Sequence, residues 1–452
     1  MKNNYSKLLH KYIPGGAHTY SKGDDQFPSN APKILIKGKG SKVYDSVGNC
    51  FIDYGMGLRS VNIGYAEKNI MNAAIKDIKK GNNLSRPTLT ELSAARTLIN
   101  LIKRADMVKF TKNGSSAVTA AVKLARAYTG KKKILICKQH PFFSYDDWFI
   151  GSTEITKGIP REIINLTMGF NYNKIEELKN IIKKNKNQIA CLVTEAVTTE
   201  CPKIKNMSGC CNKLICDRNY KKSNHFLKQV QRICNQNNII FILDEMITGF
   251  RWDLRGAQNF FNITPDISTF GKAMANGFSL AAVCGKKKIM KLGAINEKNK
   301  ERVFLLSTTH GAEMASFGAF IESVKFMKKN NVIKKNGKYA ETLIKKGNII
   351  SEKIGVLDYF KFYGPVYNPN YVCLNEDKEQ SLEYKTLFMQ EMIKNGVLMP
   401  YISISYRHTE KDLKKTLSAI EKSLIVYKQA INSGIDKYLI GSSIKPVFRK
   451  YN

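Results

Sequence analysis

Short apolar runs alternate with helical patterns from about residue 65 onward. The apolar runs cover residues 107–110, 134–136, 189–193 and 239–243, and the helical patterns lie near 66–80, 88–104, 115–129 and 174–184. Fully apolar strands that alternate with helices are typical of a mostly parallel sheet covered by helices on both faces. A sheet of this kind binds its ligands at the carboxyl ends of the strands.

The two ends of the chain follow a different pattern. Residues 33–37, 42–45 and 50–54 predict a small antiparallel meander with glycine-containing turns. Beyond residue 312 we expect helices over 312–328 and 336–352, strands within 358–375, and a helix from 409, where Thr409 and Asp412 have capping-box spacing. We therefore predict an α/β protein with a large domain over 56–311, which carries a polar insertion at 202–224, and a smaller α+β domain built from both termini, 1–55 and 312–452.

The chain is strongly basic, because 73 Lys and Arg against 37 Asp and Glu leave a net charge of +36. The basic runs are short and scattered among polar residues, whereas a nucleic-acid-binding face clusters its basic residues and adds aromatic platforms. Nucleic acid is therefore disfavoured as the main partner. The start of the chain has no apolar signal region, and no run approaches the ~20 apolar residues that cross a bilayer, so we expect a cytoplasmic protein with no membrane partner.

The cysteines do not predict a structural framework. Ten cysteines are too few for a disulfide scaffold and are expected as reduced thiols. Cys201, Cys210, Cys211 and Cys216 fall in or beside the insertion, but the adjacent Cys210 and Cys211 and the uneven gaps fit a zinc site poorly. We expect no metal and interpret the insertion as a tolerated surface segment.

Three segments carry residues suited to one kind of chemistry. Asn113, Gly114 and Ser115 join a strand to a helix start, which suits a phosphate, although such residues are also ordinary N-caps. Asp244 ends a buried strand, where a carboxylate needs a cationic partner unless it reaches solvent. Lys272 lies among apolar and small residues, where desolvation makes a lysine nucleophilic, although most lysines are simply solvated. Together they match the phosphate, ring nitrogen and aldehyde of pyridoxal 5'-phosphate (PLP).

The order and the amino-acid sequences of these and further segments resemble those of the class III aminotransferases of PLP fold type I, most closely the branch of glutamate-1-semialdehyde 2,1-aminomutase. The further motifs are Ile13-Pro14-Gly15-Gly16, Leu124-Ala125-Arg126-Ala127-Tyr128-Thr129-Gly130, Leu243-Asp244-Glu245 and Thr269-Phe270-Gly271-Lys272. The resemblance covers nearly the whole chain. It implies a large PLP domain, a small domain from both termini, and a homodimer whose active sites lie at the interface.

The resemblance also implies roles for single residues. Lys272 matches the lysine that forms a Schiff base with the cofactor, and Asp244 matches the partner of the ring nitrogen. Gly114 and Ser115, preceded by Asn113, match the turn that binds the phosphate.

Three further positions are assigned by the same resemblance. Thr308 matches the threonine that reaches the phosphate from the neighbouring subunit, although Thr309 could take that role. Glu195 matches a strand-end glutamate near the cofactor. Phe142 stands where the family has a tyrosine that stacks on the ring, so stacking is kept and a phenolic hydrogen bond is lost.

The substrate site departs from the aminomutase pattern. Lys22 takes the place of an arginine that meets the substrate carboxylate, and it lacks the bidentate fork. Arg59 and Arg86 are further candidates for a substrate anion. The segment after Trp148, which in the mutase forms a lid that retains its intermediate, is shorter here.

These departures favour an aminotransferase that acts on a small anionic or sugar-like amino or keto substrate through Lys272. The aminomutase itself is the alternative. A non-catalytic or nucleic-acid-associated protein on the same fold is an alternative of another class.

Overall fold

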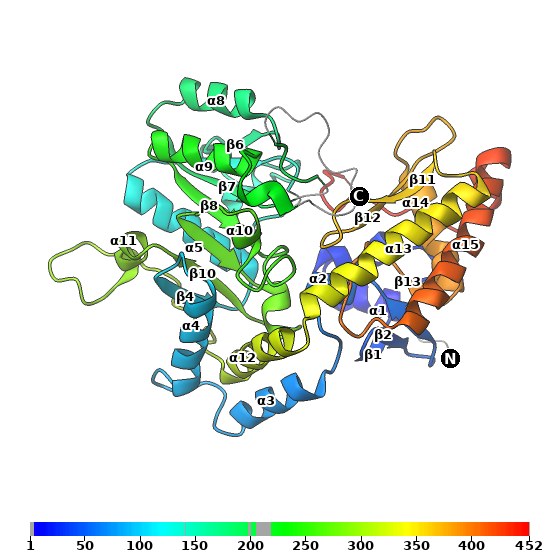
Figure 1. Ribbon diagram of the computed structural model, residues 1–452, viewed down its shortest axis with the longest axis horizontal. Helices are drawn as coiled ribbons and strands as arrows, with labels where there is room; N and C mark the ends of the chain where they lie inside the picture. Colours follow the sequence, from blue (N-terminus) through cyan, green and yellow to red (C-terminus); the bar gives the residue numbers. More distant parts are fainter. Residues whose placement is uncertain (1–3, 141, 198–199, 205–217, 452) are drawn as a thin grey trace. The chain divides into compact units, whose positions relative to one another are not determined.

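The computed structural model describes residues 4–140, 142–197, 200–204 and 218–451. It divides the chain into two compact units, which are described separately (Figure 1). The first unit runs to Glu67 and resumes over Lys334–Arg449, and the second comprises Lys68–Ile333 with the last residues from Lys450. The cysteines at 210, 211 and 216 of the insertion lie outside the described residues.

A seven-stranded sheet forms the centre of the second unit, in the order β4-β10-β9-β8-β7-β5-β6. Strands β5 to β9 pair in parallel, and β10 runs antiparallel to both β9 and β4. The strands are β4 Met107–Thr111, β5 Lys133–Cys137, β6 Thr167–Phe170, β7 Ile189–Glu195, β8 Ile240–Asp244, β9 Ile267–Phe270 and β10 Ala281–Gly285. Every residue of β7, β8, β9 and β10 is buried, which explains why each of these strands carries branched or aromatic apolar residues.

Helices surround this sheet (Figure 1). Helix α5 packs across β7 to β10, α9 packs on β8 and α8 on β6, while α12 packs on α3 and α4. The longer helices are α3 Lys68–Ile78, α4 Leu89–Leu101, α5 Gly114–Thr129, α8 Ile175–Lys184, α9 Phe226–Gln236 and α12 Met314–Lys329. Short turns of helix are α6 Asp147–Ile150, α7 Arg161–Ile164, α10 Ala257–Phe260 and α11 Lys287–Met290, with 3₁₀ turns η3 Arg218–Lys221, η4 Lys272–Ala275 and η5 Lys291–Gly293.

The first unit holds a four-stranded sheet in the order β1-β2-β3-β13 and a two-stranded hairpin β11-β12. Strands β1 to β3 form the antiparallel meander predicted from the sequence, and β13 joins β3 in parallel. The strands are β1 Leu35–Lys39, β2 Lys42–Asp45, β3 Cys50–Asp53, β11 Phe360–Tyr363, β12 Asn370–Cys373 and β13 Val397–Leu398. The helices are α1 Tyr5–Tyr12, α2 Met56–Arg59, α13 Val332–Ile354, α14 Leu382–Lys394 and α15 Glu410–Ser433, with 3₁₀ turns η1 Tyr20–Lys22, η2 Asp24–Gln26 and η6 Ile435–Lys437.

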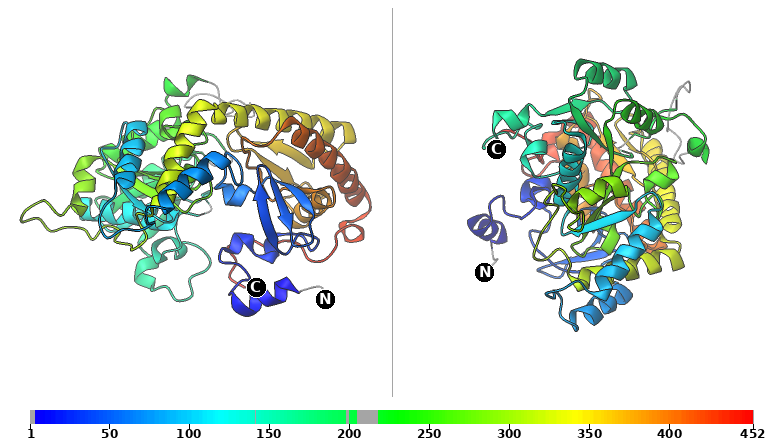
Figure 2. Two further views of the ribbon diagram at one scale, coloured as in Figure 1. Left: turned by 90° about the horizontal axis from the view of Figure 1, so that it is seen from below. Right: turned by 90° about the vertical axis from the view of Figure 1, so that its left-hand side faces the viewer.

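The two ends of the chain meet within the first unit. Gln26 donates its side-chain amide to the carbonyl of Lys445 at 2.9 Å, and Ser29 donates its hydroxyl to the carbonyl of Ile440 at 2.6 Å. Figure 2 shows the N-terminal segment in blue beside the C-terminal segment in red. The small α+β part is therefore built from both termini, as the sequence predicted.

Helix α12 departs from the expected division of the chain. The sequence placed a helix over 312–328 in the smaller α+β domain. In the structure this helix packs instead in the second unit, which holds the seven-stranded sheet. Phe317 meets Phe110 of β4 edge-on, with ring centroids 4.8 Å apart, and α12 lies along α3. The divisions at Glu67 and Ile333 thus fall later in the chain than the limits of 55 and 311 expected from the sequence.

Within the described ranges, no helix combines the length and the apolar stretch that crossing a membrane requires.

Candidate active site

The start of helix α5 carries two backbone amides that are open to a ligand. Asn113 caps the helix, because its side-chain oxygen accepts from the amide of Ser116 at 2.9 Å. Among the described residues, the amides of Gly114 and Ser115 have no acceptor. Two open N–H groups at the positive end of a 16-residue helix suit an anion, as the sequence predicted for a phosphate.

Met246 joins this helix start to the segment that carries the lysine. A Cβ atom at Gly114 would lie 2.9 Å from the sulfur of Met246, and a Cβ atom at Gly271 would lie 2.6 Å from the same sulfur. Neither position has room for a larger residue, so the thioether packs between the two glycines. The start of α5, the end of β8 and the residue before Lys272 are thereby brought to one end of the sheet.

Asp244 ends β8 with its side chain buried. The amide of Met246 donates to Oδ1 at 2.8 Å and the hydroxyl of Thr269 donates to the same oxygen at 3.1 Å. Burial raises the pKa of Asp244, against the lowering effects of these two donors and of the nearby ammonium group of Lys272. The second oxygen, Oδ2, receives neither donor and is the atom available to a cation.

The neighbouring Glu245 has a different environment. Its carboxylate accepts from the hydroxyl of Thr248 at 2.6 Å and from the amides of Ala257 and Gln258 at 2.9 and 2.8 Å. Burial raises its pKa to about 7. Both oxygens are used within the protein, so Glu245 holds the loop after β8 and is not a candidate for the chemistry.

Lys272 follows β9 on the 3₁₀ turn η4 and is half-buried. Its φ of +44° lies in the left-handed region, which is costly for a residue with a side chain. Strain of this kind is typical of functional positions, where the surroundings fix an unfavourable backbone in order to aim a side chain.

Glu195 ends β7 directly opposite Asp244 in the strand register. Its backbone amide donates to Nδ1 of His140 at 3.0 Å. Burial lowers the pKa of His140 to about 3, so the imidazole is neutral and its remaining proton is on Nε2. The structure therefore brings Glu195 to the same sheet end as Asp244 and supports it with a histidine.

The loop after β5 carries two exposed aromatic residues, Phe142 and Tyr145. Phe142 is 43% exposed and meets Phe149 edge-on at 5.8 Å, and its stacking role stays a prediction. Tyr145 lies at the start of α5: its hydroxyl is 3.3 Å from Oγ of Ser116 and 3.4 Å from Nδ2 of Asn113, and its amide donates to Oγ of Ser115 at 3.2 Å.

Sequence reasoning missed Tyr145 and Met246 as parts of this site. The turn at 113–115 was visible in the sequence, but the residues that fold back over it were not. Tyr145 lies about one helix and one strand later in the chain, so only the tertiary structure shows the contact.

Thr308 is exposed and lies in a tight turn beside β4. The amide of Gly311 donates to its carbonyl at 3.1 Å, and a Cβ atom at Gly311 would lie 2.7 Å from its hydroxyl oxygen. The contact across subunits expected of Thr308 stays a prediction.

The three cations expected at the substrate fall in different units. Lys22 and Arg59 belong to the first unit, where Lys22 is exposed on η1 and the guanidinium of Arg59 lies 5.0 Å from the ring centroid of Tyr401. Arg86 is exposed in the second unit, between α3 and α4. Their joint role in substrate binding stays a prediction.

The residues of the second unit fit the cofactor expected from the sequence. The open amides of Gly114 and Ser115 suit its phosphate, and Oδ2 of Asp244 suits its ring nitrogen. Lys272 is close enough to Asp244 for its charge to lower the pKa of that carboxyl. Polar groups left open at one buried end of a sheet are what such a cofactor requires.

Comparison with known proteins agrees with this geometry. The family described as Aminotransferase class-III matches residues 25–358. The chain is 30% identical to the 3-aminobutyryl-CoA aminotransferase of Cloacimonas acidaminovorans over 93% of its own length and 95% of that protein. It is also 30% identical to the glutamate-1-semialdehyde 2,1-aminomutase of Archaeoglobus fulgidus, over 87% of its length and 93% of that protein.

A solved structure shows the same fold. The FumI protein of Sphingopyxis sp. MTA144, solved in its PLP internal aldimine form, superposes with a TM-score of 0.81 at 21% identity, covering 95% of this chain and 97% of that one. Sequence and fold agree over almost the full length of the chain. It belongs to the class III aminotransferases, a family of PLP-dependent enzymes that move an amino group from a donor to a keto acceptor.

Proposed function

We propose that the second unit binds PLP and that the enzyme transfers an amino group to or from a small anionic or sugar-like amino, keto or aldehyde substrate. The observation that carries the proposal is the position of Met246 between Gly114 and Gly271. This packing sets the open amides of α5, the carboxylate of Asp244 and the segment of Lys272 at one end of the sheet.

Each of these groups has a task in the proposed reaction. The amides of Gly114 and Ser115 hold the phosphate, and the hydroxyl of Tyr145 closes the same turn. Oδ2 of Asp244 keeps the ring nitrogen protonated, so that the bound cofactor supplies an electron-withdrawing ring beside the substrate. Nζ of Lys272 would take the proton from the amino-bearing carbon of the substrate and deliver it, in a 1,3-shift, to the carbon of the bound cofactor that carried the aldehyde.

Release of the keto product distinguishes the proposed transaminase from the mutase. A mutase retains its intermediate behind a lid, and the segment after Trp148 is short for that purpose. Lys22, which stands in place of an arginine, also binds a substrate carboxylate more weakly because it lacks the bidentate fork. The aminomutase and the aminobutyryl-CoA aminotransferase are equally similar to this chain, so the two relatives do not favour either reaction.

We also propose that the enzyme is a homodimer. Met71, Ile75 and Ile78 recur at helical spacing on the outer face of α3, and each is at least 40% exposed. Leu89 and Leu92 of α4 are exposed as well. An apolar helix face that no described residue covers favours burial against a second copy of the chain. The shared active sites and the cytoplasmic location stay predictions.

Cofactor binding is tested by the absorption spectrum of the purified enzyme. The wild type should be yellow after incubation with PLP, and the band should be lost in Lys272→Ala. Lys287→Ala, which removes an exposed lysine of α11 outside the site, is the matched control and should keep the band. A wild type that takes up no PLP, or a Lys272→Ala variant with an unchanged spectrum, would contradict the proposal.

Incubation with glutamate 1-semialdehyde separates the two reactions. The mutase would convert it to 5-aminolevulinate without a second substrate. The transaminase should instead bleach the cofactor band with a suitable amino donor and recover it with a keto acceptor. Stoichiometric 5-aminolevulinate formation in the absence of any donor would overturn the transaminase assignment.

A further inference from the structure

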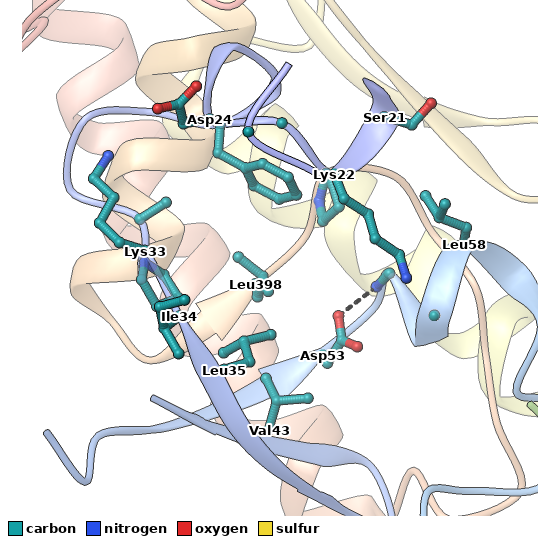
Figure 3. Close-up of a pocket in the computed structure, with 18 of the residues that line it drawn as sticks. Ser21, Lys22, Asp24, Lys33, Ile34, Leu35, Val43, Asp53, Leu58 and Leu398 are labelled. Atoms are coloured by element: carbon teal, nitrogen blue, oxygen red, sulfur yellow. Dashed lines mark hydrogen bonds between the residues drawn. The ribbon is translucent and has the colours of Figure 1, made fainter. Parts of the chain in front are cut away.

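The first unit contains a cavity of about 580 Å³ that belongs to no residue of the cofactor site. Its walls come from α1, from the segment over 16–24, from β1 and from the turns that follow β3 and β13. Figure 3 shows these side chains around a hollow that opens between the N-terminal segment and the sheet. This volume lies within the range of pockets that hold small organic ligands.

One wall of the cavity is apolar. Ala31, Val43 and Leu398 are buried members of one hydrophobic cluster, against which Phe27 packs, and all four line the cavity. Leu35 of β1 continues this surface and is 46% exposed. An apolar surface left open at the side of a core cluster favours a ligand with a hydrophobic body.

The carboxylates of the cavity are already engaged by the protein. Asp24 accepts from the hydroxyl of Ser6 at 2.5 Å and lies 3.1 Å from Nε2 of His10. Asp53 accepts from the amide of Gly55 at 2.7 Å, and its other oxygen accepts from further donors. These hydrogen bonds satisfy the oxygens of both acids, but the carboxylates still contribute negative charge to the cavity.

The lysines of the cavity are not engaged in this way. Within the described parts of the chain, Nζ of Lys22 and Nζ of Lys33 have no carboxylate within ion-pair distance. Lys22 extends into the hollow toward the end where Asp53 and Leu58 lie, whereas Lys33 stands at the opposite side near Asp24 (Figure 3). Lys22, Lys33 and Lys37 line the cavity against the two carboxylates, so the cavity offers a ligand more positive than negative charge beside the apolar wall.

We propose that this cavity binds an organic acid with an apolar body, its carboxylate on Lys22 or Lys33 and its hydrocarbon part on Val43, Leu35 and Leu398. The assignment of an anion to Lys22 rests on the proposed function, in which Lys22 contacts a substrate anion. The apolar wall and Lys33 go beyond it. The ligand is either the amino or keto substrate itself or a separate acid that regulates the enzyme.

Calorimetric titration of the PLP-loaded enzyme with hexanoate tests the site. Acetate keeps the charge without the apolar body, and 1-hexanol keeps the body without the charge. Hexanoate should bind at least about tenfold more tightly than either, because only hexanoate uses both the apolar wall and a lysine. Equal binding of hexanoate and 1-hexanol, or no binding of hexanoate, would overturn the proposal.

Variants assign the contacts. Whichever lysine holds the carboxylate, its replacement in Lys22→Gln or Lys33→Gln should weaken hexanoate binding by about fivefold, and Leu35→Ser should weaken it as well. Lys39→Gln is the matched control, because Lys39 lies on β1 like Leu35 but outside the cavity. This variant should bind hexanoate as the wild type does. If both Lys22→Gln and Lys33→Gln bind hexanoate like the wild type, the assignment of the cavity is wrong.

A competition experiment shows whether the natural ligand is the substrate or a separate acid. The cofactor absorption band separates the cavity proposal from the proposal that the enzyme binds PLP. Hexanoate that competes with the amino donor identifies the substrate as the natural occupant, whereas inhibition or activation without competition identifies a separate acid. Retention of the cofactor absorption band in every variant shows that a change in hexanoate binding does not come from loss of PLP. A protein that lacks the band but binds hexanoate would support the cavity and contradict the proposed function.

Discussion

Asp53 in the first unit and Asp244 in the second end a buried strand in the same way, yet only Asp244 keeps an oxygen available. Each accepts from the amide two residues further on, at 2.7 Å for Asp53 and 2.8 Å for Asp244. At Asp53 the second oxygen accepts from the amide of Met56 at 3.0 Å and the hydroxyl of Tyr65 at 2.6 Å. At Asp244 the other donor, Thr269, reaches the first oxygen again.

This difference shows that a buried strand-end carboxylate is not by itself evidence of a catalytic site. Both acids accept from the amide two residues further on, but only at Asp53 do a second backbone amide, of Met56, and the side chain of Tyr65 occupy the other oxygen. In the first unit a tyrosine completes the set of donors, so the acid stabilises the turn. In the second unit the donors leave one oxygen for a ligand, so the acid is available for function.

The largest effect is expected from Asp244→Asn. The amide keeps an oxygen for the donors of Oδ1 but cannot balance the charge of a protonated ring nitrogen, so kcat/KM should fall by about 10²- to 10³-fold. The free energy of unfolding of the cofactor-free protein should change by less than about 1 kcal/mol. Steady-state kinetics and urea unfolding measure the two quantities. A variant with unchanged kcat/KM would remove Asp244 from the proposed mechanism.

Glu245 gives the second prediction, through the pH dependence of stability. Its folded pKa of about 7 lies above the ordinary value of 4.5, so the folded protein binds this proton more tightly between those pH values. The contribution to stability is therefore complete below pH 4.5, is lost as the pH rises to about 7, and is level above. The loss is about 3 kcal/mol, from the size of the shift.

The matched variant for this measurement is Glu245→Gln, which cannot titrate. Burial lowers the pKa values of His140, His225 and His408 to between about 3 and 4, which gives the opposite slope in both proteins. The difference in unfolding free energy between wild type and variant cancels that slope. A difference that stays constant between pH 5 and pH 8 would show that Glu245 is ionised throughout.

Asp53→Asn should affect stability where Asp244→Asn affects activity. The side-chain NH₂ group of the new asparagine would replace an oxygen that now accepts hydrogen bonds, so it would face another donor. The free energy of unfolding should therefore fall by about 2 kcal/mol. The affinity for PLP, measured by titration of the absorption band, should be unchanged. Loss of PLP binding with normal stability would reverse the roles inferred for the two aspartates.

The sequence predicted the parts of this comparison that depend on local pattern. The helix start at 113–115, the strand that ends at Asp244 and the capping box of Thr409 with Asp412 are all confirmed, because each depends on residues that are near one another in the chain. The mostly parallel sheet was predicted for the same reason, since its buried strands are runs of branched apolar residues.

The features that the sequence did not predict depend on contacts between residues far apart in the chain. Strand β10, with its small residues Ala281 and Ala282, has no strong strand pattern and is fixed by pairing between β4 and β9. Helix α12 was placed with the wrong neighbours because its apolar residues do not reveal whether they meet Phe110 or the C-terminal helices. The open oxygen of Asp244 is likewise decided by Thr269, which lies on the next strand.

A pair of tyrosines gives the smallest and sharpest test. Tyr65 donates to Asp53 at 2.6 Å, whereas the hydroxyl of Tyr145 lies at the open start of α5, beside Ser116 and Asn113. Tyr65→Phe removes a bond to a buried acid, so it should lower the free energy of unfolding by about 1 to 3 kcal/mol and leave PLP affinity unchanged. Tyr145→Phe removes a donor that is half exposed, so stability should hold while the dissociation constant for PLP rises about three- to tenfold. Fluorescence titration with PLP and urea unfolding of both variants measure these effects. Equal PLP affinity in Tyr145→Phe and wild type would show that the hydroxyl serves only the contacts within the loop, and the phosphate would then be held by the amides of α5 without it.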